Sequence, residues 1–209
     1  QNRLWNSVIS KENNLSKNWE KQDSESVNST LIRQFGQLRN LCKDKYVILP
    51  GQNNSSSPSS FLDNTPITAI EFGFGFRAYD GNWPNFSEEE SQKLGIQMAI
   101  IKQIVEFLSK SSKSNHPLSL VRILRESVGP IDERNIGADK LDLSQYNSKL
   151  LKSHKILNSM CFEITFIGKT YNARTFMNQL SPPYLLRNFV ANRDTSDSSS
   201  VFLPSGAGF

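Results

Sequence analysis

Two long stretches in the first half of the chain repeat apolar residues every three or four positions. The first covers residues 23–42, and its apolar residues are Val27, Leu31, Phe35, Leu38, Leu41 and Cys42. This spacing places side chains on one face, so we predict an amphipathic helix. The second stretch follows Ser87 and Glu90, which have the spacing of a helix-opening capping box. Its apolar residues occupy two sides and extend to Leu108, which predicts a central helix with several neighbours.

The same spacing continues in the second half of the chain. Pro117 begins a shorter predicted helix with Leu118, Val121 and Leu124 on one side, and residues 129–130 end it. A polar loop over residues 131–137 is expected to follow.

Residues 142–167 form the longest helical pattern, and we expect the fold to be organised around it. The apolar or half-apolar positions are Leu143, Tyr146, Leu150, His154, Leu157, Cys161 and Ile164. Lys149, Lys152 and Lys155 lie on the opposite flank of the predicted helix. Gly168 directly follows, as is common where a helix ends. One long helix with a buried face and a basic face is therefore predicted.

Strand patterns are short and few. Residues 46–49 are predicted as a short strand, and residues 65–80 as the main one, because Phe72, Phe74 and Phe76 alternate with glycines. The glycines fit a dinucleotide-binding pattern, but a turn follows them where that site needs a helix. We therefore expect the aromatic residues to pack, within the molecule or between subunits.

These elements predict a mainly α fold, an antiparallel helical bundle of about four main helices with a small β element and extended polar termini. Residues 1–22 form an expected N-terminal arm in which Trp5 and Trp19 dock on the body or a neighbouring chain, or pack locally. Residues 23–193 form the bundle domain with an exposed loop over residues 51–60, and residues 194–209 form a tail.

Charge is distributed unevenly along the chain, and this indicates a class of binding partner. The 209 residues are 37% hydrophobic and carry a formal net charge of +4. They contain no apolar run of about 18 residues, so we predict no membrane span. Residues 110–174 contain 11 Lys and Arg against 6 Asp and Glu, whereas the remainder contains 13 against 14. Clustered positive charge is typical of phosphate contact, although a solvated face is the more common explanation.

No catalytic or metal-binding motif stands out. His154 and Cys161 would share a helix face, but seven residues place them about 10 Å apart, too far for a catalytic pair. Cys42 and Cys161 are expected to be buried free thiols, and His116 to serve a loop or cap. We predict no metal, no cofactor and no enzymatic activity; an enzyme that uses scattered carboxylates is the alternative.

Four segments carry a resemblance to a known family. They are the predicted long helix from Asp142, the run from Gly168 to Phe176 that contains Tyr171 and Asn172, the turn at residues 132–135, and the Ser-rich end over residues 198–209. Together they resemble coat proteins of rod-shaped plant RNA viruses of the tobacco-mosaic type. The resemblance implies a four-helix bundle with a small sheet, Arg134 and Asn135 near RNA, and Tyr171 and Phe176 as packing residues. A filamentous-virus coat protein or another nucleoprotein is the alternative.

The resemblance implies a structural coat or nucleocapsid protein that self-assembles into a helical array around single-stranded RNA, in a virion or host cytoplasm. Its partners would be RNA and copies of itself, with no membrane. The candidate RNA-binding residues are Arg122, Arg125, Arg134, Asn135, Lys149 and Lys152. The alternative function is a cytoplasmic helical interaction module whose basic face binds an acidic protein or a structured RNA.

Overall fold

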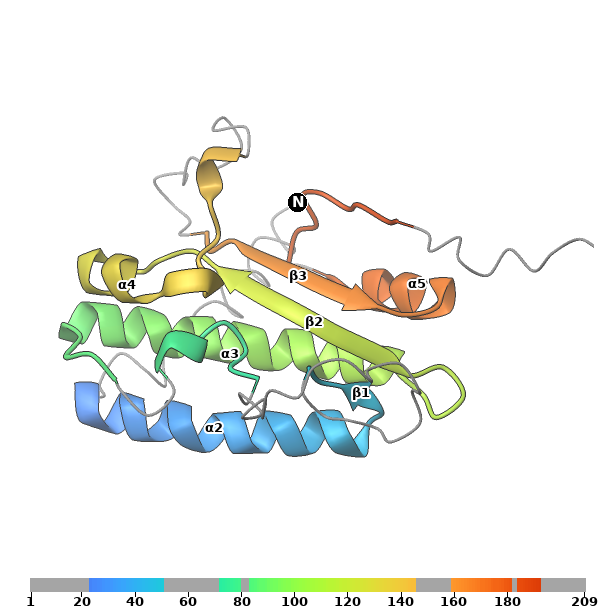
Figure 1. Ribbon diagram of the computed structural model, residues 1–209, viewed down its shortest axis with the longest axis horizontal. Helices are drawn as coiled ribbons and strands as arrows, with labels where there is room; N and C mark the ends of the chain where they lie inside the picture. Colours follow the sequence, from blue (N-terminus) through green and yellow to red (C-terminus); the bar gives the residue numbers. More distant parts are fainter. Residues whose placement is uncertain (1–22, 51–71, 80–82, 146–158, 182–183, 193–209) are drawn as a thin grey trace, which may run out of the picture.

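The computed structural model describes residues 23–50, 72–79, 83–145, 159–181 and 184–192. These residues form a mainly helical fold in which four helices pack together beside a small mixed sheet (Figure 1). The helices are α2 (Ser24–Asp44), α3 (Glu88–Ser111), α4 (Pro130–Asn135) and α5 (Thr170–Gln179). The strands are β1 (Val47–Ile48), β2 (Leu118–Arg125) and β3 (Phe162–Ile167). The predicted fold class is therefore confirmed; residues 1–22, 51–60 and 194–209 lie outside the described residues.

The two helices predicted in the first half of the chain are confirmed. Asp23 caps α2, and its carboxylate accepts a hydrogen bond from the Ser26 N–H at 2.8 Å. The capping box predicted for α3 is also present, with reciprocal bonds between Ser87 and Glu90. One row of α2 is buried, and it consists of Val27, Leu31, Phe35, Leu38 and Cys42. In α3, buried side chains on both flanks make it the central helix of the core.

Helix directions follow from contacts at the helix ends. The Ser112 hydroxyl at the end of α3 donates to the Tyr46 carbonyl just after α2, so both helices end together. Figure 1 shows α2 and α3 side by side in the same direction, which departs from the antiparallel pairing expected. Helix α5 is antiparallel to α3, because Asn172 near the start of α5 contacts Ser111 and His116, whereas Gln179 at its end contacts Ser111 and the earlier residue Phe107.

The sheet has the order β1-β2-β3, with β1 parallel and β3 antiparallel to β2. The predicted strand at residues 46–49 is confirmed as β1. In β3, the side chains of Phe162, Ile164 and Phe166 pack against the core. The alternation of these residues with polar ones is the period-two pattern of a strand that is covered on one face.

Residues 118–125, predicted as a helix, form strand β2. Leu118, Leu120 and Ile123 are buried, and the register shifts between Leu120 and Arg122. This irregularity moves the buried positions from a two-residue step to a three-residue step, which imitates helical spacing. The helical prediction was wrong for this reason.

The prediction of a long helix over residues 142–167 is also wrong for those of its residues that the structure describes. Only a 3-10 turn, η3 (Leu143–Gln145), lies at its start, and β3 occupies its end. Cys161 precedes the strand and is not in a helix, while residues 146–158, including His154, lie outside the described residues. The helix in this region is α5, which begins beyond Gly168.

The aromatic residues 72–79 form a buried turn and not the predicted strand. Phe74 and Gly75 adopt positive φ angles of 50° and 87°, and a 3-10 helix, η1 (Arg77–Tyr79), follows. Phe74, Phe76 and Tyr79 are buried, so these rings pack within the molecule. The turn expected near residues 132–135 is the short helix α4, followed by η2 (Gly137–Asp139).

Candidate nucleic-acid interface

Arg125, a residue predicted to contact RNA, is instead completely buried. Its guanidinium forms two hydrogen bonds with the Asp132 carboxylate, at 2.7 and 2.8 Å. It also donates to the Gly75 carbonyl at 2.8 Å and to the Gln97 side chain at 3.0 Å. The guanidinium carbon lies 4.3 Å from the centre of the Phe76 ring, a cation–π contact. Arg125 has no exposed surface for phosphate, so this part of the prediction is corrected.

Asp132 is buried as deeply as its partner and has four hydrogen-bond donors. Besides Arg125, the Tyr79 hydroxyl and the Val128 N–H donate to it. Burial alone would raise the pKa of the Asp132 carboxyl, but Arg125 and the other donors outweigh it and lower that pKa. Burial is also the largest cause that raises the pKa of Tyr79. The network is a structural clamp between β2, α4 and the aromatic turn.

The other predicted RNA contacts are not gathered in one place. Arg122 is exposed on the sheet and pairs with Glu163 at 2.7 Å. Arg134 and Asn135 are exposed on α4, and their side chains donate to carbonyls of that same helix. Lys149 and Lys152 lie outside the described residues. Of the described candidates, only Arg122, Arg134 and Asn135 are therefore available at the surface.

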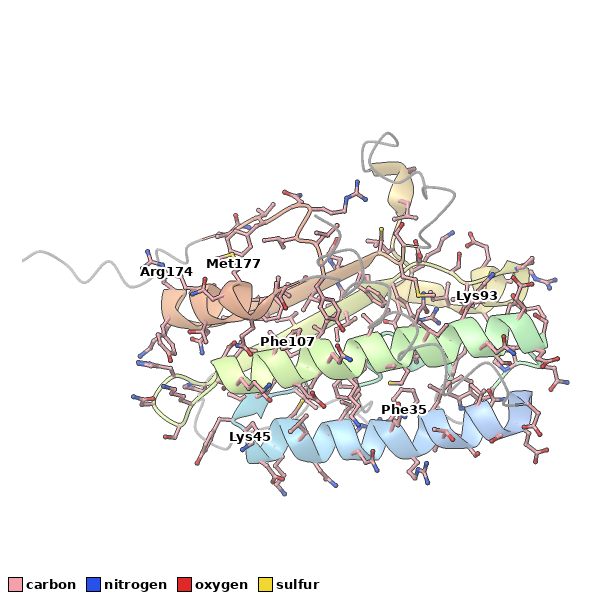
Figure 2. The ribbon with its side chains drawn as sticks, turned by 180° about the vertical axis from the view of Figure 1, so that it is seen from behind. Phe35, Lys45, Lys93, Phe107, Arg174 and Met177 are labelled. Carbon is pink, nitrogen blue, oxygen red and sulfur yellow. The ribbon has the colours of Figure 1, made fainter. Side chains whose placement is uncertain are left out.

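A different group of cations lies together where α2 and α3 end and α5 begins. We call this group the basic end, and it consists of Lys43, Lys45, Lys110, Lys113, Lys169 and Arg174. All six are exposed. Figure 2 shows Lys45 and Arg174 towards one end of the molecule and Lys93 at the other.

Hydrogen bonds hold the three helix ends together. Asn172 is fully buried at the start of α5, and its amide donates to the Ser111 and His116 carbonyls at 2.8 and 2.9 Å. The Asn172 side-chain oxygen accepts from the Lys169 N–H at 2.8 Å. The Tyr46 carbonyl, just after α2, accepts from the Ser112 hydroxyl on the same α3 end. The cations of the basic end thus stand on a fixed framework.

Helix electrostatics explain only part of this charge. Lys43 and Lys110 lie in the last turns of α2 and α3, where cations stabilise a helix. Lys169 is the N-cap residue of α5, where the helix dipole favours anions, and Arg174 lies one turn further along the helix. The positive charge of Lys169 therefore does not serve helix stability. Among the described residues, no carboxylate forms a salt bridge with any of the six cations.

Aromatic side chains lie among these cations. The Lys113 ammonium lies 5.2 Å from the centre of the Tyr171 ring, and His116 lies 5.6 Å from that ring. A hydrogen bond from Lys113 is the main reason that the pKa of Tyr171 is lowered. Tyr171 was expected to be a packing residue but is 42% exposed, whereas Phe176 is buried against Phe166 as expected.

The predicted thiol state is confirmed, because both cysteines are free. Cys42 is buried and burial raises its pKa to about 12, whereas Cys161 is half-buried. Within the ranges described, no three His, Cys, Asp or Glu residues come together as a metal site. No helix in those ranges has the length and apolar character needed to cross a membrane.

Sequence reasoning named none of the six cations of the basic end as RNA contacts. The available signal was Lys43 and Lys45 at the close of a predicted helix, but this position alone indicates only helix capping. Their proximity to α5 depends on the parallel arrangement of α2 and α3, which spacing along the chain does not encode.

Comparison with protein-family models, with curated proteins and with solved structures gives no match for this chain.

Proposed function

We propose that this chain is a non-enzymatic RNA-binding protein that holds the phosphate backbone at its basic end. The observation that carries the proposal is Lys169 at the N-cap of α5, against the preference of the helix dipole, with Arg174 one turn further along the helix. A bound polyanion would make the charge at the N-cap favourable. Phosphate would also meet the positive end of the α5 dipole there.

The surrounding charges support a backbone contact. Lysine and arginine bind phosphate without reading sequence, and their contribution comes mostly from the release of counterions. All six cations of the basic end are exposed, and among the described residues none forms a salt bridge with a carboxylate that phosphate would have to displace. Arg122, by contrast, would have to break its ion pair with Glu163 in order to bind phosphate.

Paired charge removal tests this proposal. Lys169→Ala/Arg174→Ala should weaken binding of a short RNA about 25-fold near 0.1 M salt, because each lost phosphate contact on a single strand changes log K by roughly 0.7 per decade of salt. Fluorescence anisotropy with labelled RNA measures the change.

The matched control is Lys93→Ala/Lys140→Ala, which removes the same charge from surface ion pairs away from the basic end. We expect it to change affinity less than about threefold, since exposed pairs contribute little and the positions lie away from RNA. Equal losses in both double variants would contradict a localised interface. If polyglutamate bound as tightly as RNA, and Lys169→Ala/Arg174→Ala weakened that binding, an acidic protein would be favoured as the partner.

Self-assembly into a helical coat around single-stranded RNA is a second candidate, supported by exposed apolar residues. Leu185, Leu186, Phe189 and Val190 are 82%, 52%, 46% and 73% exposed, within six positions of one another. Strand β3 is also an edge of the sheet as described. Exposed apolar residues and an open sheet edge each favour association with further copies. The rings of Phe74 and Phe76, once candidates for this contact, are buried and do not contribute.

Electron microscopy with RNA at low salt tests the second candidate. We expect filaments or discs from the unaltered chain and their loss in Leu185→Asp/Val190→Asp. Sedimentation showing a monomer at every concentration, with RNA bound, would rule out the coat and leave RNA binding in place.

A further inference from the structure

We propose that Tyr46 and Tyr171 are base-stacking residues, so that the ligand of the basic end is a single-stranded nucleic acid. This inference rests on the proposed function and adds the class of ligand and two contact residues. A duplex hides its base faces, whereas a single strand can place them on aromatic rings.

The first observation is where the exposed aromatic residues lie. Among the described residues, only Tyr46, Tyr171 and Phe189 are aromatic and more than a third exposed. The two tyrosines lie at the basic end, and Tyr46 is 53% exposed. Lys43 and Lys45 are close to Tyr46 in sequence, and Lys113 lies over the Tyr171 ring. Alternating cations and aromatic rings are the composition that binds single strands, because phosphates and bases alternate along the ligand.

The second observation is the backbone of Tyr46. Its φ angle is 58°, in the left-handed region that bulky residues rarely adopt. This position follows α2, where Gly or Asn commonly ends a helix in that conformation. Two hydrogen bonds to the Tyr46 carbonyl, from the Ser112 hydroxyl and the Leu118 N–H, hold it in place. A tyrosine is therefore kept, exposed, where helix termination alone favours a smaller residue.

The third observation is that one segment supports both tyrosines. Residues 112–118 connect α3 to β2, and their ends bond to the Tyr46 carbonyl. The same segment provides His116 and Lys113, which contact the Tyr171 ring. The Tyr46 backbone and the Tyr171 ring are thus both tied to a single connection between α3 and β2, among the cations that would hold the nucleic-acid backbone.

The test compares three ligands of equal length: a single strand, its duplex, and an abasic single strand that has phosphates but no bases. The unaltered chain should bind the single strand at least about tenfold tighter than the abasic strand, since one stacked base contributes roughly 5- to 150-fold. Similar affinities for all three ligands would overturn stacking while leaving phosphate binding intact. Failure to bind any of them would contradict the proposed function itself.

Two substitutions separate stacking from folding. Tyr46→Asn should raise the melting temperature, because Asn fits the left-handed position better, and yet weaken single-strand binding about fivefold or more. Tyr171→Leu should also weaken single-strand binding about fivefold or more. Tyr46→Phe and Tyr171→Phe keep the rings and should keep the affinity. Unchanged single-strand binding in Tyr46→Asn and Tyr171→Leu would overturn the inference.

Discussion

Among single residues, Arg125 has a different role from the one that its position in the sequence indicates. It lies in a basic third of the chain but has no exposed surface, and Asp132, Gly75, Gln97 and Phe76 surround its guanidinium. A buried pair contributes little net stability when it is complete, but loss of one partner leaves an uncompensated charge. The sequence prediction failed because charge counts do not report burial.

Asp132→Asn should therefore destabilise the fold severely. We expect the free energy of unfolding in urea to fall by about 3–5 kcal/mol, the usual cost of breaking one side of a buried ion pair. The neighbouring Glu133→Gln removes an exposed partner of Lys140 and should have a much smaller effect, because solvent screens exposed ion pairs. Similar small losses in both variants would show that the clamp contributes little.

The same carboxylate should make stability depend on pH. Because its pKa is lower in the folded chain, Asp132 contributes stability above the unfolded pKa of about 3.9, and this contribution is lost as pH falls below that value. The stability difference between the unaltered chain and Asp132→Asn should be constant above about pH 5 and shrink below about pH 4. Urea denaturation at several pH values measures it, and a difference that grows in acid would contradict this assignment.

At the scale of elements, helix prediction succeeded where amphipathic spacing was long and capped. Ser87 and Glu90 begin α3 as their spacing indicates. Spacing was misleading for β2, where a register shift makes Leu120 and Ile123 imitate a helical step. It was misleading again for β3, because one run of three- and four-residue steps was extended across Phe162–Ile167, whose own pattern is period two. The basic end could not be predicted, since it requires the packing of three helices.

The junction between α3 and α5 depends on Asn172. Its side chain is fully buried and bonds to Ser111, His116 and Lys169. Asn172→Ala should lower the free energy of unfolding by about 1–3 kcal/mol, because buried polar groups lose their partners. Asn178→Ala, at an exposed position of α5, should change it by less than about 0.5 kcal/mol. Equal effects on thermal or urea unfolding would argue against this junction.

At the scale of the whole molecule, charge is distributed along the long axis. Helices α2 and α3 run in the same direction and carry acidic residues in their first turns and lysines in their last turns. Because their ends coincide, capping preferences of separate helices add up to a basic end. The start of α5 adds Lys169 and Arg174 to it. Under the proposed function, this end, and not α4 or the sheet, meets the nucleic-acid backbone.

The salt dependence of RNA affinity is the sharpest test of phosphate binding at the basic end. For the unaltered chain, the slope of log K against log salt should be about −2 to −4, as expected for three to six phosphate contacts on a single strand. Lys43→Ala/Lys45→Ala/Lys169→Ala/Arg174→Ala should make the slope less steep by up to roughly 3 units. Lys93→Ala/Lys140→Ala should leave it unchanged. A slope near zero, or a slope that the quadruple variant does not alter, would contradict phosphate binding at the basic end.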